Sequence, residues 1–138
     1  MKIHFYKAKE GNLKDKLIGL VSVFSHVELE INNICYSSSN RDDGVRSKII
    51  DTTDSQKWVT FEFKEYIDTN KCLAYFYSVE RQEYDWTNIF LTQLIKLNVQ
   101  SDNKQICSEF VANCLGLENA YKYSPESLFY KLKELNYI

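Results

Sequence analysis

Proline and glycine are scarce in this chain of 138 residues, which contains one Pro and four Gly. This scarcity excludes a collagen-like segment and argues against a disordered tail or a flexible linker. Long apolar runs are missing too, since no stretch approaches the roughly 20 apolar residues that a membrane-spanning helix needs. The opening residues, MKIHFYKAKEGNLKDK, lack the apolar core of a secretory signal peptide. The sequence therefore predicts a cytoplasmic protein without integral membrane association.

A basic excess is also missing, because 17 Lys and Arg stand against 19 Asp and Glu, giving a formal net charge of -2. Nucleic acid is therefore not an expected partner, since phosphate-binding proteins usually carry a basic patch. The four cysteines form no CxxC pair and no Cys/His cluster with zinc spacing, so we expect no metal and no other cofactor. Without an export signal we expect free thiols rather than disulfides.

The length suits one domain spanning residues 1–138, with a single core. The alternation in KIHFYKA and KWVTFEFKE predicts two strands, and apolar spacing predicts a helix from Leu13 to Val21. FSHVELEINNICYSSS predicts a hairpin whose apolar face holds Val27, Leu29 and Ile31, with Asn32 and Asn33 in a tight turn of positive φ. RDDGVRSKII then reads as a polar turn running into another strand.

The second half of the chain is mainly helical in pattern. KCLAYFYSVERQ fits either a strand or a short helix, with helix favoured for Glu65–Asn70. DWTNIFLTQLIKL, CSEFVANCLGL and SPESLFYKLKEL each predict a helix, the second ending at Gly116 and the third capped by Ser124. The last helix has Pro125 at its first position and an apolar stripe of Leu128, Leu132 and Leu135. Helices at both ends and strands between them predict an α+β domain with helices on an antiparallel sheet.

Cys107 is the first candidate for chemistry because it falls in the first turn of a predicted helix. Unpaired backbone N–H groups and the positive end of the helix dipole stabilise a thiolate there, and the same groups could hold an oxyanion. The alternative is a structural role, since free cysteine is among the most buried residue types. Cys35, Cys72 and Cys114 lie in apolar segments and are expected in the core.

A nucleophilic cysteine needs a base, and the chain offers only His4 and His26. His4 lies near the N-terminus and reads as an exposed or edge-strand residue. His26 begins a strand and points to the side opposite its apolar face. By itself it also fits an ordinary surface histidine.

Five segments together resemble a known family: SHVELEI, CYSSSNRDDGVR, EYDW, ICSEFVANCLGL and SPESLFYKL. They are similar to the circularly permuted branch of the NlpC-like, papain-fold cysteine peptidase and amidase superfamily. YiiX-like proteins, the lecithin retinol acyltransferase group and small phage and prophage proteins belong to that branch. The resemblance runs from about residue 13 to 132. SHV on a strand and CSE opening a helix are its most specific parts, and the order His before Cys is the mark of the permutation.

The resemblance implies a central helix that carries the nucleophile and packs on an antiparallel sheet that supplies the histidine. Carried over by position, Cys107 matches the nucleophile and His26 the base. Glu109 matches the Glu of CSE and is expected to favour the positive helix end. Asp85 and Arg46 read as structural or pocket-rim residues.

Relatives orient the imidazole with a third polar residue about a dozen positions after the histidine, which gives Ser38 here. A two-residue turn at NN would instead place Ser39 opposite His26 and Ser37 on the same face, so all three serines remain candidates. Serine departs from the family pattern, because it cannot offset the charge of an imidazolium as a carboxylate does. Glu28, two residues from His26 on the same face, is the other alternative.

The resemblance thus implies a cysteine hydrolase, of peptidase, amidase or acyltransferase type, that works through a thioester. Its substrate would be a small peptide, an amide or a lipid acyl group. The alternative is a catalytically inactive member of the fold that serves as a binding or structural protein of a phage. A phage-encoded protein would act in the host cytoplasm. The sequence does not indicate which oligomeric state the protein adopts.

Overall fold

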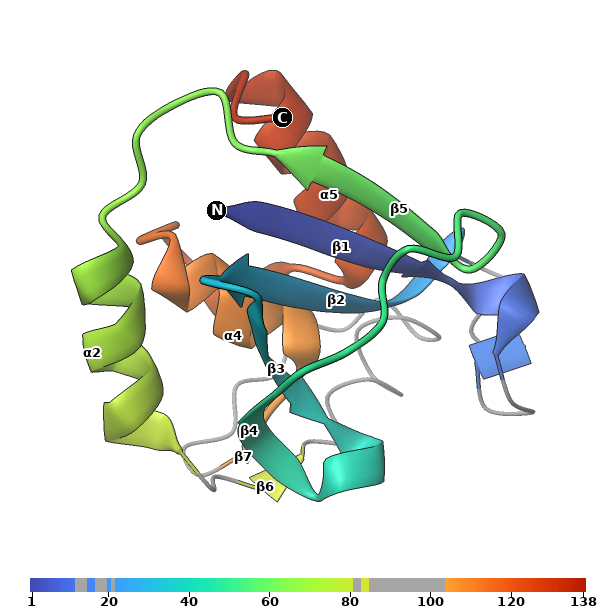
Figure 1. The fold of residues 1–138 in the computed structure, drawn as a ribbon, viewed down its shortest axis with the longest axis horizontal. Coiled ribbons are helices and arrows are strands. Elements are labelled where there is room, and N and C mark those ends of the chain that lie inside the picture. The colour runs from blue at the N-terminus through green and yellow to red at the C-terminus, as the bar shows by residue number, and fades with distance from the viewer. Residues whose placement is uncertain (12–14, 17–19, 21, 81–82, 85–103) are drawn as a thin grey trace.

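A computed structural model of the chain describes residues 1–11, 15–16, 20, 22–80, 83–84 and 104–138. Its main sheet has five antiparallel strands in the order β4-β3-β2-β1-β5 (Figure 1). The strands are β1 (Lys2–Lys7), β2 (Phe24–Ile31), β3 (Ile34–Ser39), β4 (Gly44–Lys48) and β5 (Trp58–Glu62). Two short strands, β6 (Glu83–Tyr84) and β7 (Lys104–Gln105), pair in parallel beside it.

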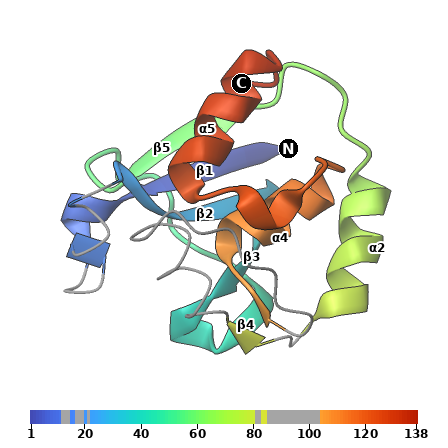
Figure 2. The same cartoon turned by 180° about the vertical axis from the view of Figure 1, so that it is seen from behind.

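The described α-helices are α2 (Thr69–Val79), α4 (Cys107–Cys114) and α5 (Pro125–Glu134), with 3-10 turns η1 (Ala8–Glu10), η2 (Asn40–Asp42) and η4 (Ala120–Lys122). Helices α4 and α5 cover one face of the sheet and stand in front of it in Figure 2. The segment 49–57, which links β4 to β5, crosses the opposite face in Figure 1. The predicted α+β class, with helices on an antiparallel sheet, is therefore confirmed.

Two of the predicted helices lie wholly or largely outside the described residues. They are the helix expected from Leu13 to Val21, of which only Asp15, Lys16 and Leu20 are described, and the one expected in DWTNIFLTQLIKL. Among the helices of the described residues, none has the length and apolar character to cross a membrane.

The predicted hairpin turn is confirmed at Asn32 and Asn33, whose φ angles are 51° and 64°. Asparagine adopts positive φ more readily than most residues, which explains the tight turn. Strands β2 and β3 pair in the expected register, with Ile31 opposite Ile34.

The β2–β3 ladder is shorter than the turn geometry predicts. It ends at Leu29 and Tyr36, and beyond that point β3 pairs only with β4, so Ser39 lies opposite Gly44. The expectation that Ser39 faces His26 across the hairpin is therefore wrong. The divergence of β2 from β3 leaves room beside His26 for another part of the chain.

Helix α2 begins later than the sequence indicates. Asp68 is its N-cap, and its carboxylate accepts hydrogen bonds from the backbone N–H groups of Asn70 and Lys71. Residues 65–68 are not helical, so the helix predicted from Glu65 to Asn70 is correct only for its last two residues. KCLAYFYSV, left open between strand and helix, is helical and buries Cys72 and Phe76.

Helix α5 has the predicted ends. Ser124 accepts a hydrogen bond from the Ser127 N–H in a capping box, and Pro125 occupies the first turn. Leu128 and Leu132 are fully buried, but Leu135 is 37% exposed because the helix ends before it and the chain turns. The prediction that Leu135 belongs to the apolar stripe of this helix is therefore wrong. Gly116, just after α4, has the expected positive φ of 70°.

The two faces of the central strands differ in chemistry. Ile3 and Phe5 of β1 and Leu29 of β2 are fully buried against the helices. Each such side chain contributes about 1.5–3 kcal/mol through burial. The opposite face carries polar residues, among them His4, which is 1% exposed. The expectation of an exposed or edge-strand His4 is wrong, because β1 lies inside the sheet between β2 and β5.

Candidate active site

Cys107 is the first residue of α4, and only 1% of its surface is exposed. The N-cap residue, Ile106, has extended backbone (φ -94°, ψ 163°) and no side-chain hydrogen bond to the first turn. The thiol therefore lies at the positive end of the helix, in a first turn that Ile106 does not cap. This is the position that the sequence predicts for Cys107.

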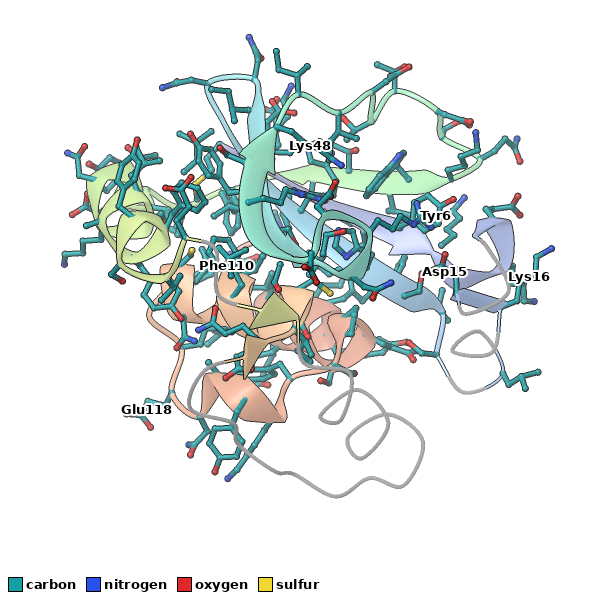
Figure 3. All side chains as sticks on the ribbon, turned by 90° about the horizontal axis from the view of Figure 1, so that it is seen from below. Tyr6, Asp15, Lys16, Lys48, Phe110 and Glu118 are labelled. Carbon is teal, nitrogen blue, oxygen red and sulfur yellow. The ribbon has the colours of Figure 1, made fainter. Side chains whose placement is uncertain are left out.

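The start of α4 is fixed from both sides by serine hydroxyls. Ser38 of β3 donates a hydrogen bond to the Gln105 carbonyl at 2.7 Å, and Ser108 donates to the Tyr123 carbonyl at 2.5 Å. One turn on, Phe110 packs against aromatic rings of α2 and lies in the interior in Figure 3. These contacts hold the helix N-terminus where β2 and β3 diverge, which is where His26 lies.

His26 lies between the thiol and a carboxylate. Its Nε2 is 2.7 Å from Oε1 of Glu28, and its side chain is also a hydrogen-bond partner of Cys107. The two β2 residues share a face because side chains two positions apart on a strand point the same way. The imidazole is 18% exposed, whereas the Glu28 side chain is buried. The structure thus brings thiol, imidazole and carboxylate together in one chain of contacts.

The surroundings of His26 favour its protonated form. Burial alone lowers the pKa of an imidazole, but the negative charges and hydrogen bonds of Cys107 and Glu28 outweigh it and raise the pKa of His26 to about 10. At neutral pH the ring is therefore an imidazolium, the form that stabilises a neighbouring thiolate.

Glu28 is held in its ionised form by Arg46 of β4. The Arg46 Nη1 donates to Oε2 of Glu28 at 2.7 Å, and its Nη2 donates to Oε1 in a two-pronged contact. Burial raises the pKa of the carboxyl, but the hydrogen bonds and charges of Arg46 and His26 outweigh it and leave the pKa of Glu28 below its usual value. Arg46 in turn donates through Nε to Asp42 at 2.8 Å.

The three serines considered as the third residue have other partners. Ser37 donates to the Val27 carbonyl at 2.7 Å, and Ser38 to the backbone before α4. Ser39 accepts a hydrogen bond from the Arg41 N–H at 3.2 Å. The expected contact between a serine and the imidazole is replaced by a carboxylate contact from Glu28.

Arg46 is the site residue whose role the sequence does not reveal. It lies in a polar turn-and-strand segment and reads as a rim residue. Its contact with Glu28 depends on β4 pairing with β3, where Arg46 lies opposite Ser37. Glu109 is buried in the first turn of α4, as its position predicts, and Asp85 lies outside the described residues.

The other three cysteines are buried free thiols in environments that differ from that of Cys107. Burial and the nearby charges of Glu28 and Glu30 raise the pKa of Cys35 to about 12. Burial also raises the pKa of Cys114, which lies beside Cys72 at the α2–α4 contact.

No protein-family model matches the chain, and neither a curated protein nor a solved structure matches it. Its function is therefore inferred from the geometry around Cys107, His26 and Glu28.

Proposed function

We propose that the protein is a cysteine hydrolase or acyltransferase that acts on an amide, ester or thioester carbonyl. Cys107 is the nucleophile, His26 its general base and Glu28 the residue that orients the imidazole. One observation carries the proposal: a helix-terminal thiol contacts an imidazole, and the same imidazole contacts an ionised, buried carboxylate. This is the nucleophile–base–orienting-group arrangement of covalent catalysis.

The fold proposed for this site is the circularly permuted papain-like arrangement. Its support is the chain order, with the histidine strand β2 before the cysteine helix α4, and the packing of α4 on the antiparallel sheet. The C-terminal helix α5 packs on the same face of the sheet. We include in this proposal the NlpC-like family that the sequence resembles.

The hydrogen-bond pattern assigns the protons of the imidazole. An ionised carboxylate only accepts hydrogen bonds, so Nε2 of His26 carries a hydrogen toward Glu28. The other ring nitrogen, Nδ1, is then the atom that exchanges a proton with the Cys107 thiol. Glu28 also offsets the imidazolium charge, which none of the serines could do.

The reaction follows from these roles. The Cys107 sulfur attacks the substrate carbonyl carbon, a C–S bond forms, and the oxygen becomes an oxyanion near the N–H groups of the first turn of α4. As the oxyanion collapses, the bond to the leaving amine, alcohol or thiol breaks, and His26 gives that group its proton. Water or another acceptor then attacks the thioester while His26 takes its proton, which releases the acyl product and frees Cys107.

The substrate approaches from the side of His26, the more exposed member of the pair. A peptide, an amide or a lipid acyl group is the proposed substrate class, since each presents a carbonyl and an apolar or peptide-like flank. The buried thiol favours a narrow acyl chain at the reacting carbonyl.

Acyl trapping tests the proposal. The protein is mixed with p-nitrophenyl esters of short and long acids, and intact and peptide masses are read after rapid acid quench. We expect an acyl adduct on Cys107 that hydroxylamine removes, with release of p-nitrophenol. Cys107→Ala should lose the adduct, whereas Cys114→Ala, a control at the other end of the same helix, should keep it.

The second candidate is a catalytically inactive protein of this fold that serves as a binding or structural module. The near-complete burial of Cys107 favours it. In that case p-nitrophenol release by the wild type would equal release by Cys107→Ala, and no adduct would form. That result would contradict the proposed hydrolase.

A further inference from the structure

A second cluster of chemically reactive side chains lies on the polar face of the sheet, next to Glu28. A ring nitrogen of His4, a carboxylate oxygen of Glu30 and the Cys35 sulfur all lie within 4.8 Å of one another. Each comes from a different strand, β1, β2 and β3 respectively. Glu30 lies opposite Cys35 in the β2–β3 ladder and diagonal to His4 across the β1–β2 ladder. Residues in these relations reach one another on one face of a sheet.

His4 has the orientation of a metal ligand. Its Nδ1 is 2.8 Å from the Thr60 hydroxyl, and its Nε2 is 2.9 Å from Oε2 of Glu30. In metal sites the non-ligating nitrogen donates to an outer partner, and Thr60 is placed for that role while Nε2 faces Glu30.

The surroundings of Cys35 and Glu30 suit a cation. The Cys35 sulfur interacts with the backbone N–H of Ile50, the contact that typically supports a metal-bound thiolate. A divalent cation bound here would take the place of the thiol proton, and its two positive charges would balance one thiolate and one carboxylate.

We propose that His4, Glu30 and Cys35 form a binding site for a divalent transition-metal ion, with Zn²⁺ the best fit. Nitrogen, carboxylate oxygen and thiolate sulfur are the ligand types of zinc, with bonds of about 2.0–2.3 Å. Tetrahedral geometry then places the ligand atoms about 3.5 Å apart, so atoms that lie within 4.8 Å of one another have to close by about 1.3 Å at most.

Three protein ligands leave one coordination position open. Glu30 is the most exposed of the three ligands, at 15%, so a water molecule or small anion would enter on its side. The site shares no residue with the proposed catalytic group, although His4 lies opposite Glu28 in the β1–β2 ladder, and it does not depend on a catalytic role for Glu28. Sequence spacing could not reveal it, because the three residues meet only through strand pairing.

Cobalt is the probe for this site. Co²⁺ is titrated into the full-length protein under anaerobic, reducing conditions, and the near-ultraviolet thiolate-to-cobalt charge-transfer band is followed. We expect a saturable band at one equivalent that Zn²⁺ abolishes by displacement. Cys35→Ser should lose the band, whereas Cys107→Ser, the matched control, should keep it.

Thr60→Val tests the assignment of His4 with little risk to folding, because Thr60 lies on an exposed edge strand and valine has the same shape. We expect the cobalt affinity to fall about 10–100-fold with the circular dichroism unchanged. The proposal is overturned by the absence of a band in the wild type. A band that persists in Cys35→Ser, disappears in Cys107→Ser or keeps its affinity in Thr60→Val also overturns it.

Discussion

Replacing Arg46 by methionine removes the cation that holds Glu28. In the native protein Arg46 gives two hydrogen bonds to the buried Glu28 carboxylate and a third to Asp42. Methionine keeps much of the aliphatic stem, so the loss is mainly electrostatic. Among the residues that the structure describes, Glu28 then keeps His26 as its hydrogen-bond partner.

The expected cost is about 3–5 kcal/mol, the range for breaking one partner of a buried ion pair. That is a large part of the roughly 5–15 kcal/mol that stabilises a typical domain. For a domain of this size it corresponds to a fall in Tm of roughly 10–20 °C. Because Glu28 is buried, the Glu28–Arg46 pair is treated as a buried ion pair rather than a surface ion pair.

The assay is urea unfolding followed by circular dichroism, with Lys48→Met as the matched control. Lys48 lies on the same strand and contacts the same Asp42, but its side chain is 44% exposed (Figure 3). An exposed pair contributes about 0–1 kcal/mol, so Lys48→Met should change little. The double variant Glu28→Gln/Arg46→Met should recover part of the loss, because it leaves no unpaired charge.

The reasoning is refuted if Arg46→Met costs no more than Lys48→Met. It is also refuted if the double variant is no more stable than Arg46→Met, since the loss would then come from packing rather than from a stranded carboxylate.

Further predictions concern pH and packing. Because the pKa of folded His26 is raised from 6.5 to about 10, its contribution to stability is complete below 6.5 and is lost as the pH rises through 10. The urea midpoint of the wild type should fall over that window more than the midpoint of His26→Gln. The pKa of Glu28 is lowered, so its contribution is present above about 4.5 and is lost in acid; acid titration by circular dichroism should show a flatter stability profile for Glu28→Gln. Leu132→Ala should cost about 2–5 kcal/mol in thermal unfolding, and Leu135→Ala much less, because only Leu132 is fully buried.

Local chemistry explains the elements that the sequence predicts correctly. The Asn32–Asn33 turn, the Ser124 cap and Gly116 after α4 each depend on the conformational preference of a few neighbouring residues. The start of α2 and the exposure of Leu135 depend on where a helix begins or ends in the packed molecule. The residue pattern alone does not fix these helix ends.

The features of the candidate site also divide into those that local sequence predicts and those that depend on the packed fold. The positions of Cys107 and His26 follow from one helix start and one strand, which the sequence indicates. The order in which strands meet decides the rest: β1 lies inside the sheet and buries His4, and β4 brings Arg46 to Glu28. The choice between serines and Glu28 depended on where the β2–β3 ladder ends, and no residue pattern marks that point.

The central claim is that His26 activates Cys107, and the rate of iodoacetamide labelling at each cysteine tests it most directly. All four cysteines are 1–5% exposed, so burial alone predicts equally slow labelling. The measurement is made by peptide mass spectrometry near pH 6, where a thiol of pKa about 8.5 is less than 1% ionised. The account predicts that Cys107 reacts first and loses this advantage in His26→Ala. Labelling of Cys107 at the rate of the other three, or unchanged labelling in His26→Ala, would contradict it.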